Sequence, residues 1–341
     1  MTAVTPVSGA APKVTVMMMT SPGFAPYFRQ AIESVLMQRT SFEFEVVVGD
    51  DNSKDGTREM ISEYAERYPG RVRPVFHVER CGNCVRNFAA TFPHCRGEYV
   101  ARLDGDDYYT DPAKLQKQVD LLDAHPELAF CAHWTALFSD DGGILTERYG
   151  PAHYRPVYGL DDFLEDGPFL PTSAVMFRRA GLAPLPAWFP KLPHEDLASW
   201  LLLCRSGACG FLDEVMSAYR SRPEGFYQGS GELEMWESQV ECLTQLRRNF
   251  GEVVQGPVYR RGMARLWGAL AQERRRSGLR WSALAATFRE ALCRVGEPAR
   301  WKDFLRVALF LHLPFLYRVT GFLGRGRKPV PPSKGNSVMH R

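Results

Sequence analysis

The chain has 341 residues, of which 45% are hydrophobic and 24% are charged. These proportions are ordinary for a globular protein, so they exclude an intrinsically disordered chain and a collagen-like chain. The length is sufficient for one large domain or two smaller domains with a full hydrophobic core.

The formal net charge of +3 is unevenly distributed along the chain. Residues 299–341 contain nine Lys or Arg residues and one acidic residue, so this segment carries +8 and the rest of the chain carries −5. Such a basic segment favours contact with an anionic surface such as lipid headgroups. Its apolar run, Val307–Tyr317, is too short to span a bilayer. We therefore expect either a peripheral membrane contact through the basic C-terminus or packing of the apolar run on the rest of the protein.

No secretory signal is visible in the first residues, because they lack a basic segment followed by a long apolar stretch. The eight cysteines are scattered. Cys131 and Cys204 lie in apolar runs, so most of the cysteines are interpreted as reduced core thiols. These features predict a cytoplasmic protein that the basic C-terminus could hold at the inner face of the cell membrane.

Strands and helices are predicted to alternate in the first part of the chain. The predicted strands are the apolar runs Val14–Met19, Phe44–Val48, Val72–His77 and Tyr99–Leu103. The predicted helices are residues 28–36, 57–68 and 84–92, and a helix after Asp111-Pro112 with Asp111 as its N-cap. Strands separated by helices of this length require right-handed crossovers. The fold class is therefore predicted to be α/β, with a doubly wound, mostly parallel sheet.

The pattern changes after about Leu128. Short, irregular strands and Pro-rich loops are expected up to Arg220, with one short helix at Leu197–Cys204, and the chain is expected to be helical after Gly231. The predicted organisation is a disordered leader over residues 1–12, an α/β domain over 13–230, a helical region over 231–320 and a basic, Pro-rich disordered tail over 321–341.

Acidic and turn-forming residues, Gly49-Asp50-Asp51-Asn52-Ser53, follow the second predicted strand. The plain interpretation is a turn and a helix cap. A turn does not require two adjacent carboxylates, however, and their repulsion costs energy. We therefore interpret Asp50 and Asp51 as acceptors for a base N–H or the ribose hydroxyls of a nucleotide.

A denser acidic cluster, Asp104-Gly105-Asp106-Asp107, follows the fourth predicted strand. Three carboxylates within four residues are unfavourable unless a cation or a ring of donors compensates them. Oxygen ligands at a strand end suit Mg²⁺ or Mn²⁺, which would bridge the phosphates of a nucleotide diphosphate. A solvated acidic loop is the alternative.

A third acidic motif, His194-Glu195-Asp196, starts the predicted short helix. Helix capping by Asp or Glu would explain it. Its position after the acidic cluster, in the region expected to bind an acceptor, favours a functional role. The first two motifs lie beyond the carboxyl ends of strands, which is where parallel-sheet enzymes bind their ligands.

In this order, the motifs resemble family 2 of the inverting glycosyltransferases, which have the GT-A fold. The resemblance covers about residues 13–222 and depends on Val14–Thr20, Asp50–Ser53 with Asp55-Gly56-Thr57, Arg86-Asn87, Gly97–Asp107 and Glu195-Asp196. The run from Arg96 to Leu122 is similar to a bacterial subgroup linked to cell-surface polysaccharide and lipopolysaccharide assembly.

The resemblance implies roles for single residues. The nucleotide pocket would be formed by Thr20, Asp50, Asp51 and Arg86. Asp104 would contact the ribose or, together with Asp106 and Asp107, the divalent metal (Mn²⁺ or Mg²⁺). Asp196 matches the general base of the family, and its neighbour Glu195 is the alternative. Tyr219-Arg220 matches a Tyr-Arg pair that is often followed by a His, and here Ser221-Arg222-Pro223 stands in place of that His.

The predicted function is the inverting transfer of a sugar from a nucleotide-diphosphate sugar to a hydroxyl of a glycan or lipid-linked acceptor, and no nucleic-acid partner is expected. Two alternatives stay open. A sugar-phosphate nucleotidyltransferase would normally carry a Gly-rich, basic loop after the first strand, whereas Thr20–Phe24 has one glycine and no cation. A catalytically inactive nucleotide-sugar-binding protein of the same fold would not need all three acidic motifs.

Overall fold

The computed structural model describes residues 11–222, 231–251, 254 and 256–293. Two compact units are distinguished within them: residues up to 222 together with 241–251 form the first, and residues 231–240 together with 256–293 form the second. The predicted tail, the apolar run Val307–Tyr317 and all but the last two residues of the predicted leader lie outside the described residues.

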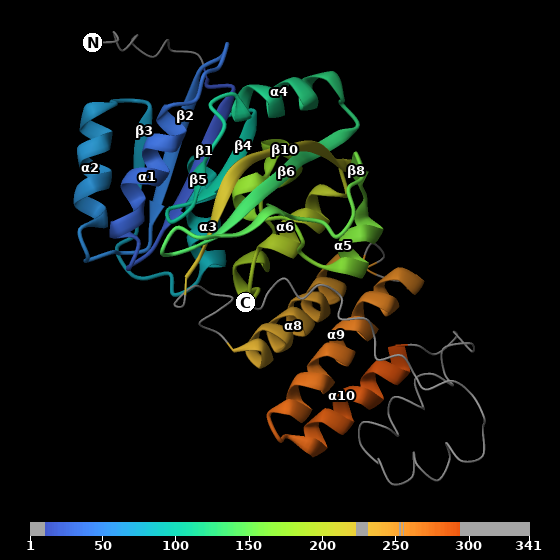
Figure 1. Cartoon of the computed structure of the whole chain (residues 1–341). Helices are drawn as coiled ribbons and strands as arrows, with labels where there is room; N and C mark the ends of the chain where they lie inside the picture. Colours follow the sequence, from blue (N-terminus) through green and yellow to red (C-terminus); the bar gives the residue numbers. More distant parts are fainter. Residues whose placement is uncertain (1–10, 223–230, 252–253, 255, 294–341) are drawn as a thin grey trace, which may run out of the picture. The chain divides into compact units, whose positions relative to one another are not determined.

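The first unit is built on one sheet, in which the strands follow the order β3-β2-β1-β4-β9-β6-β10-β5 (Figure 1). Its parallel part consists of β1 (Val14–Thr20), β2 (Phe44–Asp50), β3 (Val72–Phe76) and β4 (Tyr99–Asp104). The register pairs Thr20 with Asp50, and Met19 with Asp104, so the ends of β2 and β4 flank the end of β1. The α/β, mostly parallel prediction is confirmed for this part of the sheet.

The rest of the sheet is mixed. Long strands β6 (Leu128–Ser139) and β10 (Ala208–Ser221) are parallel to each other. The shorter strands, all antiparallel to their neighbours, are β5 (Tyr108–Tyr109), β7 (Ile144–Tyr149), β8 (Val157–Tyr158) and β9 (Met176–Arg178). The prediction of only short strands here is wrong. Strand β6 is buried almost throughout and therefore lacks alternation, and β10 is irregular between Leu212 and Ser217, where Asp213 and Glu214 interrupt its apolar pattern.

Helices cover both faces of the parallel part. The apolar faces of α1 (Ala25–Leu36), α2 (Thr57–Arg67) and α4 (Lys114–Ala124) join one core with Val14, Val16 and Met18 of β1. Helix α3 (Cys84–Thr91) packs against β1 and β2 and places Phe88 beside Phe92 and Phe189. The remaining short helices of this unit are α5 (Leu160–Asp166), α6 (Asp196–Leu203), η1 (Phe92–His94), η2 (Thr172–Ala174), η3 (Arg179–Gly181) and η4 (Phe189–Lys191).

The start of α4 differs from its prediction. The helix begins at Lys114, with Ala113 as its N-cap, and not at Pro112. The Asp111 carboxylate accepts a hydrogen bond from the Ala113 N–H (2.8 Å) and pairs with Lys117 Nζ (2.8 Å). Asp111 therefore closes a turn before the helix, and the helix starts two residues later than expected.

The second unit is helical, as expected after Gly231. It contains the first part of α8 (Glu232–Phe250), and α9 (Gly256–Arg276) and α10 (Arg280–Cys293), which form a hairpin. Helix α9 ends before the predicted stop at Ser277-Gly278, where Gly278 has a φ of +77°. No helix in the described part of the chain is long and apolar enough to cross a membrane.

All eight cysteines lie in the described part of the chain, and none of them forms a disulfide. Cys131 is buried in the core, whereas Cys204 is partly exposed.

Candidate active site

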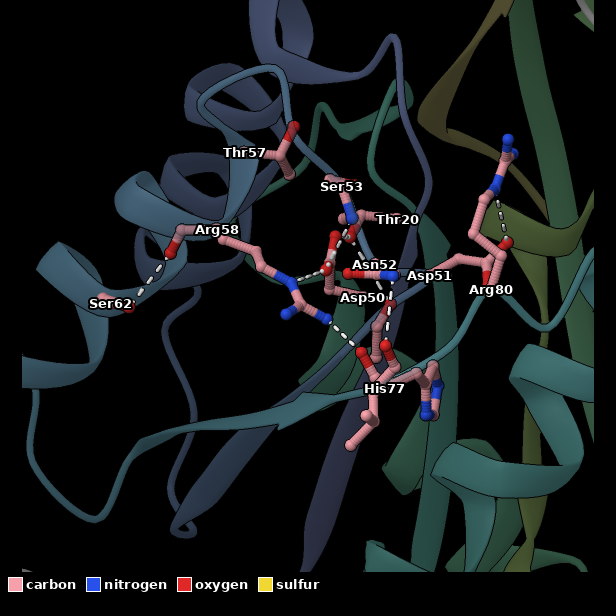
Figure 2. Close-up of polar contacts among 12 residues, drawn as sticks. Thr20, Asp50, Asp51, Asn52, Ser53, Thr57, Arg58, Ser62, His77 and Arg80 are labelled. Atoms are coloured by element: carbon pink, nitrogen blue, oxygen red, sulfur yellow. Dashed lines mark hydrogen bonds and ion pairs between the residues drawn. The ribbon is translucent and has the colours of Figure 1, made fainter.

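Asp50, at the end of β2, is fully buried and already engaged by the protein. Its carboxylate accepts hydrogen bonds from Thr20 Oγ1 (3.2 Å), the Ser53 N–H (3.0 Å) and Arg58 Nε (2.5 Å). Figure 2 shows Arg58 reaching from α2 to Asp50 and to the carbonyl of His77, to which it also donates. Asp50 thus holds the turn after β2 in place.

Asp51 points away from this network and toward the loop that follows β3 (Figure 2). One carboxylate oxygen accepts a hydrogen bond from the Cys81 N–H, and the other lies 3.9 Å from Arg80 Nε. The neighbouring Asn52 has a φ of +55° and donates to the carbonyl of Val78. The loops after β2 and β3 are therefore joined at the predicted nucleotide site.

Asn87 fixes α3 against the carboxyl ends of β1 and β2. Its amide donates to the carbonyls of Thr20 (3.1 Å) and Gly49 (3.4 Å), and its oxygen accepts from Thr91 Oγ1 (3.1 Å). Gly49 is required for this approach, because a Cβ there would lie 2.0 Å from Thr91 Oγ1. The adjacent Arg86 has an exposed side chain beside the loop after β3, where its Nη1 lies 3.5 Å from the Cys81 carbonyl.

The three carboxylates of the acidic loop after β4 point to different partners. Asp104 accepts a hydrogen bond from Thr172 Oγ1 (2.8 Å), Asp106 pairs with Arg222 Nη2 (2.7 Å), and Asp107 accepts from the Arg220 N–H (2.9 Å). The end of β10 supplies a backbone donor to this loop, and Arg222, which follows the strand, supplies a guanidinium. Donors of the chain itself therefore offset part of the repulsion among the carboxylates, which is one of the two forms of compensation that the sequence left open.

The loop is nevertheless a strained electrostatic environment. Burial raises the pKa of Asp104 to about 6, although the nearby Arg102 opposes this shift. Burial, with Asp106 and Asp104 as neighbours, raises the pKa of Asp107 well above its usual range. Asp107 Oδ2 is also buried and has no hydrogen-bond partner among the described residues.

The donor set fits a metal that is shared with substrate phosphates. In the described part of the chain, no three His, Cys, Asp or Glu side chains are arranged to hold a metal ion by themselves. Mg²⁺ in phosphate-binding sites usually needs only one or two carboxylates, since water and the phosphates supply the other ligands. Asp104 and Asp106 are partly exposed and can serve in this way, whereas Asp107 is 1% exposed and lies beneath the backbone of Arg220.

Glu195 and Asp196, at the start of α6, occupy different environments. Glu195 forms a buried ion pair with Arg102 of β4, with 2.7 Å between Oε1 and Nη2. Although burial opposes it, Arg102 holds the pKa of Glu195 below its usual range. Asp196 is partly exposed, and its Oδ1 is buried without a hydrogen-bond partner in the described part. Burial and the charge of Glu195 raise the pKa of Asp196 well above its usual range.

Arg102 is the residue that sequence reasoning missed. Its side chain is completely buried, lies over the Phe88 ring (4.7 Å) and interacts electrostatically with Asp104, Glu195 and Asp196. It therefore joins the acidic loop to the start of α6. The signal was present, because a charge inside the apolar run Tyr99–Leu103 must find a partner when it is buried.

Comparison with known proteins identifies the family. Residues 16–183 match the family model described as Glycosyl transferase family 2. A Bacillus subtilis protein named for teichuronic acid biosynthesis, the glycosyltransferase TuaG, is 30% identical over 196 residues, which cover 57% of this chain and 73% of TuaG. The chain belongs to glycosyl transferase family 2. An uncharacterized protein of Mycobacterium tuberculosis is 34% identical over 235 residues, which cover 67% of this chain but 66% of that relative.

Two solved structures share the fold of this family 2 member. Residues 1–349 of S. aureus TarS, in complex with UDP-GlcNAc, give a TM-score of 0.53 at 16% identity and cover 92% of this chain and 93% of that one. The mannosyltransferase PcManGT of Pyrobaculum calidifontis, in complex with GDP-Man and Mn²⁺, gives a TM-score of 0.55 at 17% identity. The match covers 93% of this chain and 89% of PcManGT. These likenesses confirm the predicted fold class.

Proposed function

We propose that this chain transfers a sugar from a nucleotide-diphosphate sugar to an acceptor hydroxyl with inversion at the anomeric carbon. One observation carries the proposal: β4 and α6 place the acidic loop and Asp196 around the same buried guanidinium, Arg102. A donor diphosphate at Asp104 would then lie close to the partly exposed carboxylate of Asp196. Family membership supports the same reaction.

The donor would be held by the edge formed by β1, β2 and β4. Thr20, Asp51 and Arg86 would contact the nucleotide, while Asp50 would keep the turn after β2 in shape. Asp104 and Asp106 would hold a divalent metal, which when bound would supply positive charge to the departing diphosphate. Fold relatives have been solved with UDP-GlcNAc and with GDP-Man and Mn²⁺, which supports a donor of this class.

Asp196 would act as the general base. Its carboxylate, which is partly exposed, would take the proton of the acceptor hydroxyl while the hydroxyl oxygen attacks the anomeric carbon, opposite the leaving diphosphate. A carboxylate of ordinary pKa near 4 is a weak base. The raised pKa of Asp196 makes it a stronger one, since a base works best when its pKa is close to the working pH. Glu195 would be a positioning residue, because its charge is committed to Arg102.

The acceptor would be a glycan or a lipid-linked saccharide of the cell envelope, which the name of TuaG supports. A peripheral contact at the inner face of the membrane, through the basic residues 299–341, is part of this proposal, although that segment lies outside the described residues. Family membership disfavours a nucleotidyltransferase. An inactive binding protein is the remaining alternative, and a transfer assay distinguishes it.

A panel of nucleotide sugars, screened by thermal shift with and without Mn²⁺, tests the donor site. At least one donor should raise the unfolding temperature, and Mn²⁺ should increase the shift. Asp106→Asn should weaken metal-dependent donor binding by about tenfold or more, because it removes one charged ligand at nearly constant size. Asp161→Asn, on the exposed side of α5, is the matched control and should bind as the wild type does. Equal metal-independent binding by both variants would contradict the proposed metal site.

A further inference from the structure

Arg222, the residue that follows β10, is an unusual neighbour for a proposed metal ligand. Its guanidinium lies 2.7 Å from Asp106 Oδ2, and the side chain is only 10% exposed. It also lies over the rings of Phe24 (4.7 Å) and Tyr27 (5.2 Å). Its Nε is buried and has no hydrogen-bond partner among the described residues, so the guanidinium has unused donor capacity.

The rings of Phe24 and Tyr27 form an aromatic shelf under Arg222. This shelf adjoins the sheet edge of β1, β2 and β4, where the donor would bind. A Cβ at Gly105 would lie 2.7 Å from Thr20 and 3.0 Å from the Phe24 ring, so the acidic loop, the end of β1 and the shelf are in contact. Arg222 thus lies over two aromatic rings beside the position where a diphosphate would meet Asp104 and Asp106. A planar guanidinium in this setting can pair with either a carboxylate or a phosphate.

Arg222 already occupies Asp106 Oδ2, and its positive charge beside this carboxylate opposes the approach of a divalent metal. We infer that Arg222 and the metal compete for Asp106, and that the donor diphosphate resolves the competition by accepting Arg222 while the metal takes Asp106. This inference rests on the proposed function, because it assumes that the acidic loop binds a metal and a diphosphate. Under this competition, the metal binds weakly to the free enzyme and strongly to the donor complex.

Thermodynamic linkage makes the competition between Arg222 and the metal measurable. If the diphosphate strengthens metal binding by some factor, the metal must strengthen diphosphate binding by the same factor. In the wild type this factor includes the release of Asp106 from Arg222. In Arg222→Gln the competing charge is absent, so Mn²⁺ should bind the nucleotide-free protein about tenfold more tightly, and metal-free UDP or GDP should bind about tenfold more weakly. The coupling factor should fall accordingly.

The experiment is calorimetric titration of Mn²⁺ with and without UDP or GDP, on folded wild type, Arg222→Gln and Arg222→Lys. The Lys variant keeps the charge without the planar fork and should lie between the other two. The matched control is Arg148→Gln, which removes an arginine of β7 that is paired with Asp213 of β10 (3.0 Å). Unchanged nucleotide-free Mn²⁺ affinity in Arg222→Gln, or an equal rise in Arg148→Gln, overturns the inference. Failure of the wild type to bind either nucleotide with Mn²⁺ contradicts the proposed function instead.

Discussion

Replacing Asp196 by Asn is expected to lower the rate of sugar transfer by about 10²–10⁴, the usual contribution of a positioned general base. Amide and carboxylate are nearly isosteric, so the fold and the affinity for donor and metal should remain. The measurement is the single-turnover transfer rate, alongside donor affinity, once a donor and acceptor are identified. A capping role would give a different result, because Asn caps a helix as well as Asp does. The structure records no side-chain cap at this helix start, where Glu195 is the N-cap residue.

Glu195→Gln is the companion variant, and its expected effect is different in kind. It leaves the buried Arg102 guanidinium without its counter-charge, and breaking a buried ion pair typically costs about 3–5 kcal/mol. The main loss should therefore appear in the free energy of unfolding. Normal transfer by Asp196→Asn together with a stable but inactive Glu195→Gln would move the base by one residue. Normal transfer by both variants would contradict the proposed mechanism.

The raised pKa of Asp196 adds a stability readout. Because its pKa in the folded protein lies above that of the unfolded chain, the stability contributed by its protonated form is lost as pH rises through the folded pKa. Asn cannot ionise and escapes this loss. Asp196→Asn should therefore be at least as stable as the wild type at neutral pH, with a gain that grows with pH. The acid limb of the wild-type rate profile should lie at higher pH than an ordinary carboxylate would give.

The parts of the fold that sequence predicted are those with a local signal. The strands from Val14 to Asp104 are short apolar runs bounded by turns, and the helices between them have clear apolar faces, so both were placed within a few residues. The acidic loop after β4 was placed for the same reason. The long strands β6 and β10 show no alternation of apolar and polar residues, so their length was not predicted. The start of α4 was misplaced because it depends on which backbone group Asp111 bonds.

The electrostatics of the site could not be predicted in this way. Asp106 meets Arg222, and Glu195 meets Arg102, across sequence separations that no local pattern encodes. The sequence argument therefore counted the acidic charges without their basic partners and could not choose between a cation and a ring of donors as the compensation. Charged residues inside apolar strand runs are the signal to follow, because burial forces each of them to find a partner.

Lys114, the first residue of α4, is an exception to this rule, because it is buried without an acidic partner. It is fully buried, donates to Gln118 Oε1 (2.7 Å) and lies 3.9 Å from the centre of the Tyr109 ring. No ion pair to Lys114 is present in the part of the chain that the structure describes. Burial lowers the pKa of Lys114 from 10.5 to about 7. This lowering corresponds to about 5 kcal/mol of stability that is missing when the group is protonated.

Lys114→Met is accordingly expected to raise the free energy of unfolding at pH 7 by about 1–3 kcal/mol, after the lost contacts with Gln118 and Tyr109 are subtracted. The pH dependence of this stability difference identifies the buried charge of Lys114 as its cause. Between about pH 7 and pH 10.5 the unfolded wild type binds the proton and the folded wild type does not, so wild-type stability gains on the Met variant as pH rises. The advantage of Lys114→Met should be largest below pH 7 and should shrink toward pH 10.

Denaturant unfolding of both proteins at several pH values measures this difference. The neighbours Cys131 and His133 do not titrate in this window, because burial raises the pKa of the thiol to about 12 and lowers that of the imidazole well below its usual value. Lys117→Met is the matched control on the same helix, where a half-exposed lysine pairs with Asp111 and Glu214, and it should change stability by less than about 1 kcal/mol. A Lys114→Met variant that is less stable than the wild type by the same amount at every pH would contradict the lowered pKa, because it would show that Lys114 binds its proton equally in the folded and unfolded states and contributes only packing and its hydrogen bond.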